Sequence, residues 1–135
     1  MPTEEIKTYQ LRKCKTFFIS LHLKTSKFNQ MEYKPRIADK MLAKKLASKG
    51  AILIEGPKWC GKTTTAEQQA KSILYMDNPA SLETNLQMAE IEPSVLLDGD
   101  TPRLIDEWQL APKLWDAIRF EVDHRHEVGQ FVLTG

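Results

Sequence analysis

A glycine-bounded loop, "GPKWCGKT" at residues 56–63, is the feature that most constrains the fold of this chain. The apolar run "AILIE" precedes it, and "TTTAEQQAKS" continues from its last threonine. A short apolar run that ends in a turn is typical of a buried strand, and the residues after the loop favour a helix. A strand that leads through a tight loop into a helix begins a crossover unit. The loop therefore predicts a parallel sheet covered by helices.

The loop also predicts a ligand, because it fits the spacing G-x-x-x-x-G-K-[ST] at every position. In such a loop the main-chain amides surround a polyphosphate, and a bare glycine lets the backbone come close to it. Lys62 is expected to meet the β- and γ-phosphates, and the Thr63 hydroxyl to ligate Mg²⁺. We therefore expect ATP and Mg²⁺ as cofactors. The expected nucleotide-binding residues are Gly56, Pro57, Lys58, Trp59, Cys60, Gly61, Lys62, Thr63 and Thr64.

Two side chains of this loop are expected to point away from the phosphates, those of Trp59 and Cys60. For Trp59, a packing role and a contact with the nucleotide both stay open. Cys60 is not expected to be a nucleophile, and it and Cys14 are too few for a disulfide framework or a zinc site. The alternative for the whole loop is a glycine-rich turn without a ligand.

The stretch "PRLIDEWQ" at residues 102–109 supplies a second set of candidate residues. A strand that ends in Asp106 and Glu107 can place one carboxylate near a metal ion and the other near a water molecule. We expect Asp106 to hold Mg²⁺ and Glu107 to orient and deprotonate the attacking water. Adjacent acids favour the ATPases in which another strand lies between the two motif strands. The stretch "QFVLTG" is the candidate for that strand, which would place Thr134 near the γ-phosphate; Thr134 as a strand-end residue only is the alternative.

The remaining chain alternates helical patterns with short apolar runs, as crossover units require. We expect helices in "KPRIADKMLAKKLASKG", "TTTAEQQAKS", "ASLETNLQMAEI" and from Pro112 to about His126. We expect strands in "AILIE", "SILYMD", "RLIDEW" and "QFVLTG". The apolar face expected on the first helix comprises Ile37, Ala38, Met41, Leu42 and Leu46, and that on the last comprises Leu114, Trp115, Ile118 and Val122. Residues 1–30 show no sustained period and are expected to form a poorly ordered N-terminal extension, with the working domain over residues 31–135.

Bulk composition narrows the class of protein. No apolar run approaches the roughly 20 residues of a membrane helix, and no secretory leader is evident, so we expect a cytoplasmic protein without membrane contact. Residues 1–50 carry twelve Lys and Arg against four Asp and Glu, whereas residues 51–135 carry seven against fourteen. A basic head of this kind is compatible with a nucleic-acid partner, and a solvated helix face is the alternative.

With both motifs in hand, residues 33–135 resemble the prokaryotic AAA-type ATP-binding proteins that carry a C-terminal domain of unknown function. The resemblance is most specific at "GPKWCGKT" and "LIDEWQLAPKLWD". It implies a P-loop NTPase fold of the AAA type, a three-layer α/β sandwich with a parallel sheet. It also implies that Lys62 and Thr63 lie at the phosphates and magnesium, that Asp106 and Glu107 form the Walker B pair, and that Thr134 is the sensor residue.

The same resemblance implies a strand order of 5-1-4-3-2, of which this chain would supply 1-4-3-2. We therefore expect a domain truncated after its fourth core strand, with an exposed edge, without the segment that would carry an arginine finger, and with a missing C-terminal domain or a homo-oligomer as its context. We then expect such a truncated domain to bind nucleotide more readily than it hydrolyses nucleotide at a fast rate. The rivals are a small-molecule kinase with the same loop, a nucleotide-binding module without catalysis, and a basic-headed nucleic-acid binder.

Overall fold

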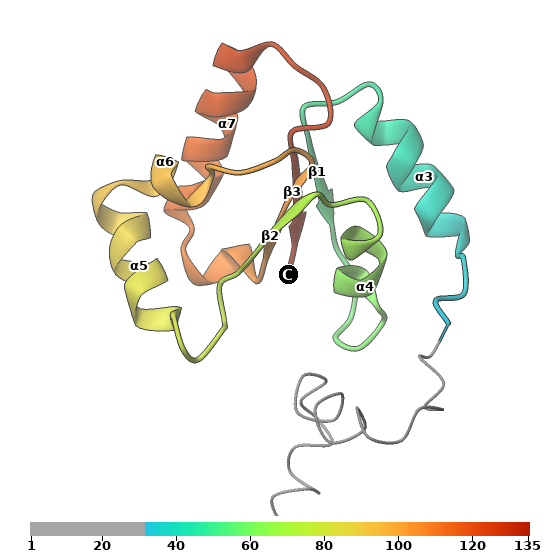
Figure 1. Cartoon of the computed structure of the whole chain (residues 1–135), viewed down its shortest axis with the longest axis horizontal. Helices are drawn as coiled ribbons and strands as arrows, with labels where there is room; N and C mark the ends of the chain where they lie inside the picture. Colours follow the sequence, from blue (N-terminus) through green and yellow to red (C-terminus); the bar gives the residue numbers. More distant parts are fainter. Residues whose placement is uncertain (1–31) are drawn as a thin grey trace, which may run out of the picture. The chain divides into compact units, whose positions relative to one another are not determined.

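Four parallel strands form the centre of the computed structural model, which describes residues 32–135 (Figure 1). The strands are β1 (Ala51–Ile54), β2 (Ser72–Tyr75), β3 (Arg103–Asp106) and β4 (Phe131–Thr134), and their order across the sheet is β1-β4-β3-β2. This order and the helices between the strands confirm the predicted α/β class and the order 1-4-3-2. The predicted extension over residues 1–30 lies outside the described residues.

The register of the strands brings their carboxyl ends to one edge of the sheet. Thr134 pairs with Ile54 on one side and with Asp106 on the other, and Asp106 pairs in turn with Tyr75. Because all four strands are parallel, the loop that follows β1 and the acidic residues that follow β3 emerge at this same edge. The strand that separates them, β4, was predicted from the sequence, and the structure confirms its place.

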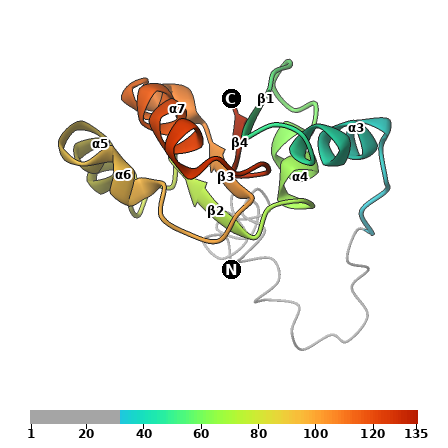
Figure 2. The same ribbon diagram turned by 90° about the horizontal axis from the view of Figure 1, so that it is seen from above.

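Helices cover both faces of the sheet and make a three-layer sandwich (Figure 2). One face carries α3 (Ile37–Leu46) and α4 (Lys62–Glu67). The other carries α5 (Leu82–Ile91), α6 (Pro93–Leu96) and α7 (Lys113–Arg125). None of the helices within residues 32–135 has the length and apolar character needed to cross a membrane.

Alternation along the strands divides the core between these two layers, because successive side chains of a strand point to opposite faces. Phe131 and Leu133 of β4 join the cluster under α5, α6 and α7, whereas Val132 between them joins the cluster under α3 and α4. Every residue of β4 is buried. Strand β4 is therefore packed on both faces, which fixes the position of Thr134 at the carboxyl edge of the sheet.

Several helix boundaries and faces differ from the sequence-based expectation. The first helix runs over ten residues, Ile37–Leu46, and buries only Leu42 and Leu46, while Ile37 is 82% and Met41 56% exposed and Ala38 is exposed as well. The expected five-residue apolar face was wrong because α3 lies at the edge of the sheet, where it packs mainly on β1 and α4, and a narrow stripe suffices there. On α7, Leu114 and Ile118 are buried as expected, whereas Trp115 is 40% exposed and packs on Trp108 with ring centroids 5.4 Å apart.

Candidate functional site

The loop at residues 56–61 joins β1 to α4, as the motif requires. Gly61 adopts a left-handed conformation with φ of +89°, which side-chain-bearing residues rarely adopt. A Cβ atom at this position would also lie 2.0 Å from the Arg36 guanidinium, so the space is filled as well. At the other end of the loop, a Cβ on Gly56 would lie 3.1 Å from the Cys60 sulfur. Gly61 therefore depends on the absence of a side chain for its backbone conformation and for the packing of Arg36, whereas Gly56 has a close contact with Cys60 alone.

Lys62 lies across this loop, at the first residue of α4. Its Nζ atom donates to the carbonyl oxygen of Gly56 at 2.5 Å and to that of Pro57 at 3.3 Å. The ammonium group is thus held by neutral carbonyl oxygens of the loop, so within residues 32–135 its positive charge is not paired with an acidic side chain there. An ionised phosphate oxygen is a stronger partner for an ammonium than a carbonyl is, so a bound polyphosphate can take over these contacts.

Directly after the loop lysine, Thr63 takes part in a cluster of three side-chain oxygens. Asp106 at the end of β3 is 7% exposed, and its Oδ1 accepts hydrogen bonds from the Thr63 hydroxyl at 2.7 Å and from the Thr134 hydroxyl at 2.5 Å. These residues come from α4, β3 and β4, three elements that the register of the sheet brings together. A carboxylate beside two hydroxyls is an all-oxygen group of the kind that a small hard cation prefers.

This oxygen cluster fits magnesium only as part of a larger ligand set. Within residues 32–135 there is no group of three or more His, Cys, Asp and Glu side chains that could hold a metal ion by itself. Mg²⁺ needs six oxygen ligands and characteristically takes several from water and substrate phosphates. Thr63 and Asp106 therefore fit a metal that arrives with a nucleotide.

Glu107 follows directly after Asp106 and leaves the strand in a left-handed conformation, with φ of 56° and ψ of 42°. This conformation is costly for a residue with a side chain and recurs at functional sites. Its carboxylate accepts a hydrogen bond from the Gln109 amide, and Gln109 also lies where a Cβ on Gly135 would be. Gln109 was not among the predicted site residues, although it is the last residue of the quoted stretch "PRLIDEWQ".

Tyr75 is a second residue that the sequence analysis missed. It pairs with Asp106 in the sheet, and its hydroxyl donates to Glu67 Oε1 of α4 at 2.7 Å. Burial, followed by the hydrogen bond to Glu67, raises the pKa of Tyr75, so the phenol stays protonated and available as a donor. The signal that could have found it is the strand order, which places the last residue of β2 beside the last residue of β3.

The remaining predicted residues lie on the loop or in the first turn of α4, and within residues 32–135 their side chains form no hydrogen bond or salt bridge. Pro57, Lys58 and Cys60 are exposed, and Thr64 is half-buried on α4. Trp59 is 98% exposed at a φ of 69°, so within residues 32–135 its indole does not pack against a core. The structure thus removes the packing role for Trp59 within this part of the chain and leaves the contact with a nucleotide as a prediction.

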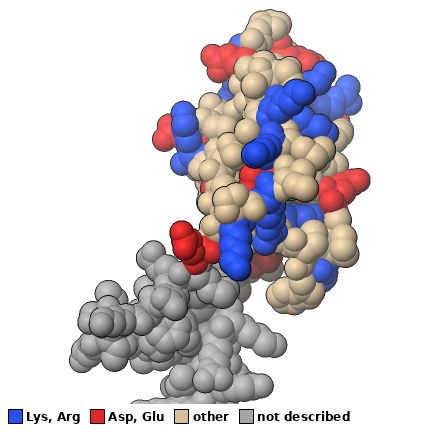
Figure 3. Space-filling view, turned by 90° about the vertical axis from the view of Figure 1, so that its right-hand side faces the viewer, with Lys and Arg blue, Asp and Glu red and all other residues tan. Residues whose placement is uncertain are grey.

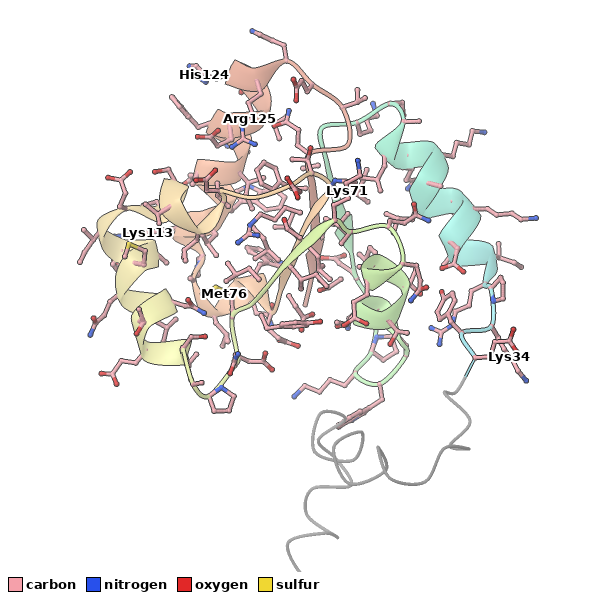
Figure 4. All side chains as sticks on the ribbon, in the orientation of Figure 1. Lys34, Lys71, Met76, Lys113, His124 and Arg125 are labelled. Atoms are coloured by element: carbon pink, nitrogen blue, oxygen red, sulfur yellow. The ribbon has the colours of Figure 1, made fainter. Side chains whose placement is uncertain are left out.

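Charged residues elsewhere have structural partners. Arg103 lies at the start of β3, at the edge of the sheet opposite the loop, and donates to the Leu96 carbonyl at 2.9 Å and to the Ser72 hydroxyl at 3.0 Å. Burial lowers the pKa of this guanidinium, and nearby Asp98 opposes the shift. His124 and Arg125 lie at the end of α7, away from the loop (Figure 4). Neither Arg103 nor His124 therefore lies beside the loop.

Lys and Arg side chains gather on the face that α3 presents to solvent (Figure 3). The exposed lysines of this helix are Lys40, Lys44 and Lys45. These three lysines belong to the described part of the basic head, and their exposure is that of a solvated helix face. A nucleic-acid partner for it stays a prediction.

Comparison with known proteins adds one finding. A family model described as "AAA domain" matches residues 48–135, which include the loop, Asp106, Glu107 and Thr134. No curated protein and no solved structure matches the chain. The matched region begins just before β1 and runs through β4, so it coincides with the sheet and the site at its edge. The further C-terminal domain implied by the resemblance is not part of this match.

Proposed function

The chain belongs to the AAA domain family, and from this premise we propose that it binds Mg·ATP and hydrolyses it to ADP and phosphate. Family membership supports nucleotide binding in general. The observation that carries the finer proposal is that Thr63 and Thr134 both donate to Asp106, while Lys62, the residue before Thr63, donates to carbonyl oxygens of the loop. The ATPase portion lies within residues 31–135. The proposal places it in the cytoplasm, where the exposed thiol of Cys60 stays free.

Binding rests on the loop backbone and Lys62. The amides between Gly56 and Thr64 surround the phosphates, and Lys62 exchanges its two carbonyl partners for β- and γ-phosphate oxygens. Thr63 and Asp106 would hold Mg²⁺, Asp106 through water. When bound, the metal supplies positive charge beside the phosphate oxygens that gain negative charge during transfer.

Hydrolysis requires a base near the attacking water. Glu107 follows Asp106 directly, and its left-handed backbone ends the strand at this point. In the proposed reaction the water oxygen attacks the γ-phosphorus, the bond to the β,γ-bridging oxygen breaks, and Glu107 accepts the water proton. Thr134 lies at the end of the neighbouring strand and is proposed to hold its hydroxyl near the γ-phosphate.

The direct test is a titration of the purified chain with ATP in a calorimeter, with and without magnesium. We expect saturable binding with Mg·ATP and affinity weaker by roughly tenfold or more when EDTA removes the metal, because Thr63 and Asp106 then face the phosphates without a shared cation. A carboxylate near a triphosphate is repulsive in the metal's absence. Heat that is indistinguishable from buffer dilution in both titrations would contradict the proposal.

Product analysis separates hydrolysis from the rival activity, a small-molecule kinase. We expect γ-labelled ATP to release its label as free phosphate with water as the only acceptor, because Glu107 activates water in the proposed reaction. Label that appears only when a cell extract supplies an acceptor, and then on that acceptor, would support the kinase. A chain that binds Mg·ATP and releases no phosphate in single-turnover conditions would support the module without catalysis.

A further inference from the structure

Arg36 reaches the phosphate loop from outside it. The guanidinium of Arg36, the residue before α3, donates through Nη1 to the carbonyl oxygen of Cys60 at 3.2 Å and to that of Gly61 at 3.3 Å. These partners lie 24 and 25 residues further along the chain. A Cβ atom on Gly61 would lie 2.0 Å from Nη1 and 2.8 Å from Cζ, so the guanidinium packs directly on the bare glycine. The glycine is thus required by its neighbour as well as by its backbone angle.

These contacts determine which way the loop amides point. In a trans peptide the carbonyl oxygen and the following N–H lie on opposite sides of the bond. By holding the carbonyls of Cys60 and Gly61, Arg36 directs the N–H groups of Gly61 and Lys62 away from itself. The Gly61 carbonyl also accepts the N–H of Thr65 at 2.9 Å, so the same oxygen joins the loop to α4. Arg36 therefore stabilises the amide orientation that an anion cradle needs.

Arg36 is itself held in place. Its backbone N–H donates to Asp39 Oδ2 at 2.6 Å, and the Asp39 N–H donates back to the Arg36 carbonyl at 3.1 Å. The helix that follows is anchored by Leu42 and Leu46 in the same cluster as Ala66 of α4. The guanidinium is thus fixed to the scaffold at its base and to the loop at its tip.

We propose that Arg36 is a positioning residue for phosphate binding, which acts by holding the carbonyls of Cys60 and Gly61 so that the loop amides face the ligand. The inference rests on the proposed function, because it concerns the same loop. It gives a role to the segment before α3, which lies outside both the loop at residues 56–63 and the stretch at residues 102–109. The ligand chemistry it serves is the pyrophosphate portion shared by ADP and ATP, because the amides concerned lie in the loop itself.

The test compares the full chain with Arg36→Ala, Arg36→Lys and a matched control, Lys44→Ala. Lys44 is an exposed cation on the same helix with no contact to the loop recorded in the described structure. We expect Arg36→Ala to weaken binding of both Mg·ADP and Mg·ATP by roughly 5- to 30-fold, the range for loss of a charge-assisted contact. Arg36→Lys should recover part of the affinity, because an ammonium reaches the carbonyls without the planar fork. Lys44→Ala should stay within about twofold of wild type.

Two further measurements distinguish positioning from charge and from folding. A general charge effect is screened by salt, so the loss for Arg36→Ala should persist between about 0.05 M and about 0.5 M salt if it arises from positioning. Trp59 is next to Cys60 and fully exposed, so its emission without nucleotide should change in Arg36→Ala, and Trp59→Phe should abolish that difference. Thermal melting checks that each variant is folded; if Arg36→Ala is not, Arg36→Gln and Arg36→Lys carry the comparison.

The outcomes separate this inference from the proposed function. Wild-type binding together with equally tight binding by folded Arg36→Ala would overturn the inference alone. A loss of nucleotide affinity in Arg36→Ala that disappears at high salt would also overturn the inference, because the positive charge of Arg36 would then explain the loss without positioning. Failure of the wild-type chain to bind Mg·ADP or Mg·ATP would overturn the proposed function and this inference with it.

Discussion

Replacement of Glu107 by glutamine is expected to lower the rate of ATP hydrolysis by about 10²- to 10⁴-fold, the usual contribution of a positioned general base. Glutamine keeps the size of the side chain and an acceptor for the Gln109 amide, but it cannot take a proton from water. Mg·ATP binding should change by less than about threefold, since the base acts on water in the transition state. Turnover should fall while affinity stays.

The measurement is a single-turnover assay with protein in excess over γ-labelled ATP, because a slow basal rate is then still resolved. Glu83→Gln is the matched control, since Glu83 is an exposed glutamate in the first turn of α5, outside the site. Hydrolysis by Glu107→Gln at the wild-type rate would refute the role of Glu107. A parallel loss in Glu83→Gln would show that the effect does not belong to the site.

Much of this site could be predicted because its geometry follows from two simple facts. Parallel strands end at one edge of a sheet, and the order of the strands decides which ends are neighbours. Once the strand ending in Thr134 is placed between the other two, the meeting of Thr63, Asp106 and Thr134 follows. The hydrogen bonds to Asp106 are the direct expression of that order.

The contacts of Arg36 and Gln109 could not be predicted in the same way. Each depends on where a side chain ends outside the strands of the sheet, and no periodic pattern determines this. The segment around Arg36 carries the signals of a helix start, which account for its backbone but not for its side chain. Short elements were missed for a related reason: α6 has four residues and the turn of 3₁₀ helix at Trp108–Leu110 has three, too few for a helical period.

The exposed face of α3 shows a different limit of sequence patterns. Ile37 and Met41 occupy helical positions next to the buried Leu42, and the sequence alone assigns them to the same apolar stripe. Hydrophobic periodicity gives the side of a helix that can be buried, while the width of the partner surface decides how much of it is. At the edge strand β1 that surface is narrow, so two of the five expected residues are buried.

Replacement of Lys62 by alanine is expected to weaken Mg·ATP binding by about 10- to 100-fold, which corresponds to loss of one or two charge-assisted contacts with phosphate. The loss should be larger for ATP than for ADP, because the lysine is placed to meet both β- and γ-phosphate oxygens. Calorimetric titration of both nucleotides gives the two ratios. Lys71→Ala is the matched control, since this exposed lysine follows α4 at the end away from the loop (Figure 4).

Lys62 also contacts the carbonyls of Gly56 and Pro57, so its removal could act by loosening the loop and not through the phosphates. The two causes predict different changes in the affinities for ATP and ADP. A loosened loop weakens ATP and ADP by the same factor and lowers the melting temperature without nucleotide, whereas a lost phosphate contact weakens ATP more and leaves that temperature unchanged. Undiminished affinity of Lys62→Ala for Mg·ATP would refute the loop as the phosphate site, because no other ammonium within residues 32–135 is held at the loop's own carbonyls.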